Sequence, residues 1–280
     1  MLIFQYESKA QIDAPAYQEF TQTLLNPYII NPALADTSTR LNLRFNHISE
    51  LGMFNGVNRF YLDADTQLGP MRNERMHNVG VQMTSSHFGE FIRKNRFKFR
   101  YSVFLQLSRK SAVSAGLSLG MLNYTFQTTQ AGSGGADNAP DGSFGLRYFW
   151  KKWSMGASVQ QLFKSELQPI DRRFTLQNLY NLELYRKFMF SPKVSFQTQA
   201  VLQVKGSNDP DYSLNVMFDY MDMLYVGATD YSWEKISVNM GFKQSISQTY
   251  FLSFFVSYTL FYSNTPLSDN TLELFFTFSK

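Results

Sequence analysis

From Arg40 to the end of the chain, apolar residues recur at every second position over segments of about ten residues. In one such segment, for example, Phe97 and Phe99 alternate with Lys98. A period of two is that of a β-strand, whose successive side chains point to opposite faces. About ten residues is also the length that a tilted strand needs to cross a bilayer. The pattern therefore predicts transmembrane β-strands that turn one face towards lipid.

About fourteen such segments follow one another between residues 40 and 280, and an even number of strands is usual for bacterial outer-membrane barrels. The connections between the segments alternate in length. Short connections cover residues 108–110, 151–152 and 221–223, and long ones cover residues 47–56, 125–142 and 164–174. Such barrels have short periplasmic turns and longer external loops. We therefore expect an all-β fold, an antiparallel up-and-down transmembrane β-barrel that crosses the outer membrane many times and has both termini in the periplasm.

A soluble β-sandwich also has alternating strands, because one face of each sheet is buried and the other is solvated. Three features favour the barrel. The strands have the length that spans a bilayer, the faces opposite the apolar ones are too polar for a second core, and aromatic residues such as Trp150, Trp153 and Tyr220 stand at strand ends. The chain has 27 Phe and 16 Tyr but only 17% charged residues, which suits a lipid-facing surface.

Several functional classes find no support in the composition. The net charge is only +4 and no long run of Lys or Arg occurs, so we expect no nucleic-acid partner. The chain has no Cys, and His47, His77 and His87 lack metal-ligand spacing, so we expect no metal and no other cofactor. Ser86 and His87 are adjacent on a predicted strand and would point to opposite faces, which disfavours a nucleophile–base pair. We expect that the protein is not an enzyme.

Charged residues occupy the face opposite the apolar one, and both signs occur on segments predicted to be neighbours, as with Arg44 beside Asp63 or Asp65. We interpret them as a network that neutralises itself across the lumen. The predicted network comprises Arg40, Arg44, Asp63, Asp65, Lys98, Arg100, Glu183, Asp219, Lys243 and Glu273. Small residues at other inward positions, such as Ser114 and Gly116, leave room for water, a folded-in loop or an N-terminal plug.

The region before residue 40 does not alternate. Residues 1–10 end in Ser8-Lys9-Ala10, which we interpret as the remnant of a secretory signal peptide, and residues 11–39 form a lead-in to the barrel of residues 40–280. Two Asn-Pro steps fix the backbone and remove amide donors, so the lead-in should be ordered without being a strand. We predict that it plugs or caps the periplasmic side of the barrel or docks a partner. The candidate residues are Asn26, Pro27, Tyr28, Asn31 and Pro32.

The same lead-in carries a resemblance to a known family. The matching stretches are Phe20-Thr21-Gln22, Asn26-Pro27-Tyr28 and Ile30-Asn31-Pro32-Ala33, followed by residues 61–70 and 144–163. In these stretches the chain resembles the PorP/SprF family of Bacteroidetes outer-membrane proteins. Asp36 stands where the family usually has Gly, and Asp also tolerates turn conformations.

The resemblance implies a role in type IX secretion. The implied partners are a PorK/PorN-like periplasmic ring, a secreted adhesin whose export, surface attachment or gliding function the barrel serves, or both, together with outer-membrane lipid. A passive or solute-selective porin is the alternative. A porin needs an open lumen, and the mixed charges of the predicted lumen lack the ring of one sign that sets ion selectivity.

Overall fold

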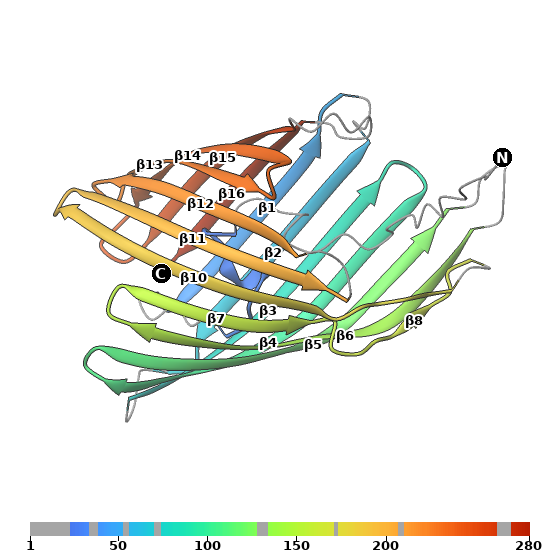
Figure 1. Ribbon diagram of the computed structural model, residues 1–280, viewed down its shortest axis with the longest axis horizontal. Coiled ribbons are helices and arrows are strands. Elements are labelled where there is room, and N and C mark those ends of the chain that lie inside the picture. The colour runs from blue at the N-terminus through green and yellow to red at the C-terminus, as the bar shows by residue number, and fades with distance from the viewer. Residues whose placement is uncertain are drawn as a thin grey trace, which may run out of the picture.

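The computed structural model describes residues 23–33, 39–52, 56–69, 74–127, 134–170, 173–206, 210–261 and 270–280. Fourteen of the described strands form a closed antiparallel barrel, in which consecutive strands are neighbours, β7 pairs with β10, and β16 closes the ring on β1 (Figure 1). The barrel strands are β1 (Leu41–Glu50), β2 (Val57–Gln67), β3 (Arg75–Phe88), β4 (Ile92–Ser108), β5 (Ser111–Phe126), β6 (Gly135–Trp150), β7 (Trp153–Gln160), β10 (Leu179–Ser191), β11 (Val194–Lys205), β12 (Asp211–Tyr220), β13 (Leu224–Tyr231), β14 (Lys235–Ser245), β15 (Phe251–Phe261) and β16 (Thr271–Ser279). The predicted barrel and its strand number are confirmed.

Burial in this barrel is the reverse of burial in a soluble protein. On β1, Arg44 is 6% exposed, whereas its neighbours Leu43 and Phe45 are 41% and 39% exposed. On β4, the inward Arg100 is 4% exposed and the outward Phe99 is 61% exposed. Alternation therefore reflects a polar lumen and an apolar outer wall, which is the pattern of a barrel surrounded by lipid.

Several strands are longer than the alternation predicts. The predicted loop 125–142 is wrong in its second half, because β6 begins at Gly135 and pairs with β5 from Phe126 onward. β10 likewise continues to Ser191, so only residues 192–193 connect it to β11. β4 has 17 residues, more than the roughly ten that cross a bilayer. The part of a strand that extends past the membrane needs backbone partners but no apolar face. That part therefore lacks the alternation of apolar and polar residues that marks the rest of the strand.

Most of the tightest connections lie at one end of the barrel, although residues 89–91 and 232–234 form short turns at the other end. Tight turns at residues 109–110, 151–152, 192–193 and 221–223 lie at the same end as the backbone hydrogen bond from Leu41 to Lys280. The opposite end carries the connection 161–178, which contains the two-stranded sheet of β8 (Glu166–Leu167) and β9 (Phe174–Thr175). We call the first end the terminal end. The predicted signal-peptide remnant lies outside the described residues.

Candidate functional site

Residues 23–33 lie among the inward-facing side chains of the barrel. Asn26 precedes the 3-10 turn η1 (Pro27–Ile29), in which Pro27 supplies the fixed backbone angle of a first helical position. Ile30 and Asn31 both donate their amide hydrogens to the Pro27 carbonyl, at 3.1 and 3.0 Å. Tyr28 is buried, as are the residues that follow it to Ala33. No helix in the described ranges is long and apolar enough to cross a membrane.

One wall of the barrel holds this segment through its backbone carbonyls. Gln160 Nε2 on β7 donates to the carbonyl oxygens of Ile29 and Ile30, each at 2.8 Å. Ser158 Oγ, on the same strand, also donates to the Ile30 carbonyl at 2.7 Å. A buried carbonyl must find a donor, and here the lumen side chains replace the partners that a strand would have supplied.

Asn31 joins the segment to the strands on either side of β7. Its Nδ2 donates to Glu183 Oε1 on β10 at 2.6 Å and to the Leu146 carbonyl on β6 at 3.2 Å. Its Oδ1 accepts from the Ala33 amide at 2.9 Å, which bends the chain after Pro32. All the polar atoms of this buried amide group therefore have partners.

Two glycines allow the segment to approach the wall closely. A β-carbon at Gly116 on β5 would lie 2.2 Å from the Pro32 carbonyl oxygen, and one at Gly145 on β6 would lie 2.0 Å from Asn31 Oδ1. Gly116 and Gly145 are paired directly across the two strands. Any larger residue at either position would displace the segment.

Contacts also reach the opposite walls. Thr23 Oγ1 donates to Gln199 Oε1 on β11 and accepts from Asn215 Nδ2 on β12, at 3.3 Å in both cases. Leu24 and Leu25 pack against a buried cluster of Met217, Tyr225, Phe255 and Phe275. The segment thus touches side chains on both sides of the lumen.

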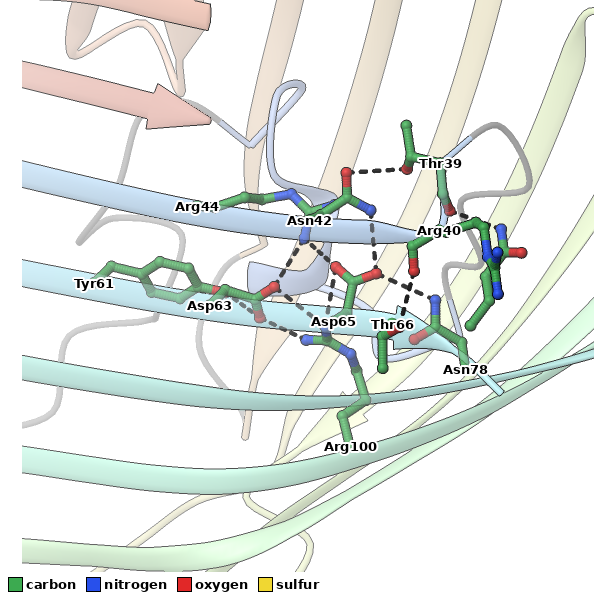
Figure 2. Close-up of polar contacts among 11 residues, drawn as sticks. Thr39, Arg40, Asn42, Arg44, Tyr61, Asp63, Asp65, Thr66, Asn78 and Arg100 are labelled. Carbon is green, nitrogen blue, oxygen red and sulfur yellow. Dashed lines mark hydrogen bonds and ion pairs between the residues drawn. The ribbon is translucent and has the colours of Figure 1, made fainter. Parts of the chain in front are cut away.

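The charges around Tyr28 form a compact buried cluster on β1, β2 and β4 (Figure 2). Arg44 Nη1 lies 2.8 Å from Asp63 Oδ1 and also contacts Asp65, while Arg100 Nη1 lies 2.7 Å from Asp63 Oδ2. The guanidinium carbon of Arg100 lies 3.5 Å from the centre of the Tyr28 ring, and that of Arg44 lies 5.0 Å from it. Burial raises the pKa of Tyr28, so its ring stays neutral beside these cations.

The sequence matches one family model over nearly its whole length. The model describes the type IX secretion system membrane protein PorP/SprF, and it matches residues 12–278. The chain belongs to the PorP/SprF family. A search among curated proteins finds no match.

Solved structures show which fold this PorP/SprF protein shares. The CymD monoaromatic hydrocarbon channel is 14% identical with a TM-score of 0.62, over 96% of this chain and 94% of that chain. A deltaS2S3 mutant of the TodX monoaromatic hydrocarbon channel is 12% identical with a TM-score of 0.63, over 91% and 94%. A FadL homologue of Pseudomonas aeruginosa is 10% identical with a TM-score of 0.54, over 89% and 91%. At these identities the likeness shows the fold alone, and family and fold together support an outer-membrane location.

The other predicted charges of the PorP/SprF barrel have partners of several kinds. Glu183 contacts Arg147 as well as Asn31, and Glu273 accepts from Asn46 Nδ2. Asp219 accepts from Ser195 Oγ at 2.8 Å, and Lys187 Nζ lies 3.7 Å from it.

Sequence reasoning missed one carboxylate of this lumen. Lys98 Nζ lies 3.1 Å from Asp141 Oδ2, and Arg96 Nε lies 2.6 Å from the same oxygen. Asp141 lies within the stretch 125–142 that the sequence predicts to be a long connection, whereas the residue faces inward on β6. The sequence does contain a pattern that indicates a further inward carboxylate. Arg96, Lys98 and Arg100 share one face of β4, and three buried cations require carboxylates nearby.

Two residues of the predicted lumen network do not belong to it. Arg40 is exposed just before β1, and its carbonyl accepts from Thr66 Oγ1 at 2.9 Å (Figure 2). Lys243 pairs at 2.7 Å with Asp222, a turn residue whose side chain is 62% exposed. Both positions lie at the terminal end, where side chains at inward positions reach solvent.

Proposed function

We propose that this PorP/SprF-family protein is an outer-membrane component of type IX secretion that acts through bound protein partners and not as an open pore. The observation that carries the proposal is the position of residues 23–33, which contact side chains on both sides of the lumen. The expected partners are a PorK/PorN-like periplasmic ring, a secreted adhesin that is exported, attached to the surface or used in gliding, or both.

The contacts of residues 23–33 favour a permanent plug. Each hydrogen bond to Gln160 or Ser158 contributes roughly 0.5–1.5 kcal/mol net, and the one to the Glu183 carboxylate contributes roughly 1.5–3 kcal/mol. Withdrawal of the segment would also leave Glu183 and the Tyr28-facing guanidinium groups with fewer partners in the lumen. A segment held in this way closes the lumen in the resting protein. The protein therefore acts by binding partners at the two exposed ends of the barrel.

The assignment of the two ends supports a periplasmic partner. Most of the tightest turns, the start of β1 and Lys280 share the terminal end, and single-chain outer-membrane barrels keep their short turns in the periplasm. We therefore assign the terminal end to the periplasm and the end with connection 161–178 to the cell exterior. A ring partner would meet the first, and a surface adhesin would meet the second.

A solute channel is the competing function. The structural neighbours CymD and TodX are described as monoaromatic hydrocarbon channels, which favours this reading at the level of the fold. A channel requires a continuous path through the lumen, and such a path would have to pass beside residues 23–33 and the buried cluster of Arg44, Arg100 and Asp63. The two functions differ in what loss of the protein would do: a channel supports solute uptake, whereas a secretion partner supports protein export.

The direct test is to purify the tagged full-length chain from native membranes and to measure protein export in cells that lack it. We expect secretion-system proteins or an exported adhesin to co-purify, and we expect export or surface retention of that adhesin to be lost without the chain. A tagged outer-membrane barrel of another family is the control. Unchanged export, together with co-purification no richer than the control, would contradict the proposal.

A further inference from the structure

The terminal end of the barrel carries most of the exposed positive charge of the described chain. Its exposed cations are Arg40, Arg75, Arg109, Lys110, Lys151, Lys152, Lys193 and Lys280, and its exposed acidic residues are Glu74 and Asp222. At the opposite end, acidic residues such as Glu90, Glu166 and Glu234 stand among the basic ones. With a net charge of only +4 for the whole chain, this is an asymmetric distribution that gives the terminal end a positive field.

A cavity of about 390 Å³ opens within this basic end, between residues 23–33 and the inner wall. We call it the mouth cavity. Its cationic lining consists of Arg147, Lys151, Lys152 and Lys187, and no carboxylate stands among the described residues that line it. Its apolar lining comes from Leu24, Pro27, Phe149 and Trp153. Cavities of this size that combine apolar walls with a few polar groups are typical binding sites.

The cations of the mouth cavity are incompletely neutralised by the protein itself. Arg147 is held by Glu183. Lys187 Nζ lies 3.7 Å from the Asp219 carboxylate, and its side chain is 35% exposed. Lys151 lies 4.9 Å from the ring of Trp150, and Lys152 is exposed at the tip of the same turn. Lys187, Lys151 and Lys152 can therefore turn towards an incoming anion at little cost.

The shape of the cavity distinguishes between possible anions. Its wall residues Phe149, Ser154, Tyr185 and Gln197 stand on β6, β7, β10 and β11 and face the lumen, so lipid headgroups around the barrel do not reach it. The apolar side chains of Leu24, Pro27 and Phe149 would gain nothing from a simple inorganic anion. A peptide with carboxylates next to apolar side chains satisfies both parts of the lining.

We propose that the mouth cavity binds an acidic, partly apolar peptide segment of a periplasmic partner, with Lys151, Lys152 and Lys187 receiving its carboxylates. This inference rests on the proposed function, since it assumes that partners meet the terminal end. It assigns the partner a chemical character: a negatively charged surface with a projecting segment that enters the barrel mouth.

The test uses the full chain in phosphatidylcholine nanodiscs and a short fluorescein-labelled peptide in which Glu and Leu alternate. Fluorescence anisotropy gives the dissociation constant, with the Gln–Leu peptide as the uncharged probe. The variant K151Q/K152Q removes two cations from the cavity rim. R109Q/K110Q is the matched control, because it removes two cations from the neighbouring exposed turn, whose Lys110 carbonyl accepts from the Lys151 amide at 2.8 Å. Heat-dependent gel mobility checks that both variants fold.

We expect K151Q/K152Q to weaken binding of the acidic peptide by about tenfold and R109Q/K110Q to weaken it by less than about twofold. Equal weakening by both variants would show a diffuse electrostatic attraction and overturn the inference, as would absence of binding to the wild-type chain. Binding that occurs only after removal of residues 11–22 would show that the chain fills its own cavity, which also overturns it. If the peptide fails to bind while secretion partners still co-purify, only this inference falls and the proposed function stands.

Discussion

Replacement of Arg44 by Met should destabilise the barrel more than replacement of both Arg44 and Asp65. The Arg44 side chain is 7% exposed and contacts Asp63 and Asp65, whose side chains are 0% and 1% exposed. In R44M, Asp65 keeps hydrogen bonds from Asn42 and Asn78 at 3.2 Å, but its nearest cation becomes Arg100 at 3.8 Å. Breaking a buried ion pair by removing one partner costs about 3–5 kcal/mol. Because Asp65 keeps its two amide donors, we expect R44M to lower the free energy of unfolding by about 3 kcal/mol, the low end of this range.

The coupling between Arg44 and Asp65 is the informative quantity. Asp65→Asn keeps the shape of the side chain and removes the charge that R44M would leave uncompensated. The double variant should therefore be about 2 kcal/mol more stable than the sum of the two single effects implies. Urea unfolding of the barrel from lipid bilayers, followed by tryptophan fluorescence, gives the free energies. The control cycle is K243M with D222N at the exposed turn, where the coupling should stay below about 1 kcal/mol. Equal coupling in both cycles would refute the view that the lumen charges are buried and mutually dependent.

Two further predictions concern the lumen segment and the lipid face. The chain has no Cys, so a disulfide between Ala33→Cys and Ser114→Cys should form on mild oxidation, because Ser114 Oγ contacts the Ala33 carbonyl. The control pair, Ala33→Cys with Ser253→Cys on β15, should not form one. Equal disulfide yields of the two pairs on non-reducing gels would contradict the placement of the segment. Phe99→Lys, at a residue 61% exposed in the middle of β4, should destabilise the barrel by about 2–4 kcal/mol, whereas Phe190→Lys beside a terminal turn should cost at most about 1 kcal/mol. Similar costs in urea titrations would show that the two sites do not differ in membrane depth.

The strands could be predicted from the sequence because lipid imposes one rule on every strand. A residue such as Phe99 must be apolar and Arg100 must be polar, whichever strands lie beside them. This rule stops at the membrane surface. The start of β6 at Gly135 and the short pair of β8 and β9 lie outside the alternating segments. Ala139 and Leu167 pack there in a small buried cluster, and such single apolar residues leave no periodicity in the sequence.

The sequence predicted which types of feature lie in the lumen but not which residues contact one another there. Small inward residues indicated space, and two Asn-Pro steps indicated an ordered segment, but the hydrogen bond between Asn31 and Glu183 joins residues 152 positions apart. Such a contact depends on the closure of the ring and on the register of every intervening strand. For the same reason Asp141 was missed, since its inward direction follows from its pairing with Gly120 and not from its neighbours in the sequence.

Single-channel conductance in planar bilayers tests the central claim most directly, because it asks whether residues 23–33 close the lumen. The measurement compares the wild-type chain, the chain without residues 11–33, and the Ala33→Cys/Ser114→Cys variant under oxidising conditions, each with folding checked by gel mobility. We predict little conductance for the wild-type and cross-linked barrels and a clearly larger conductance for the truncated one. A large and steady conductance of the wild-type barrel, unchanged by the truncation, would contradict the account and favour the channel function.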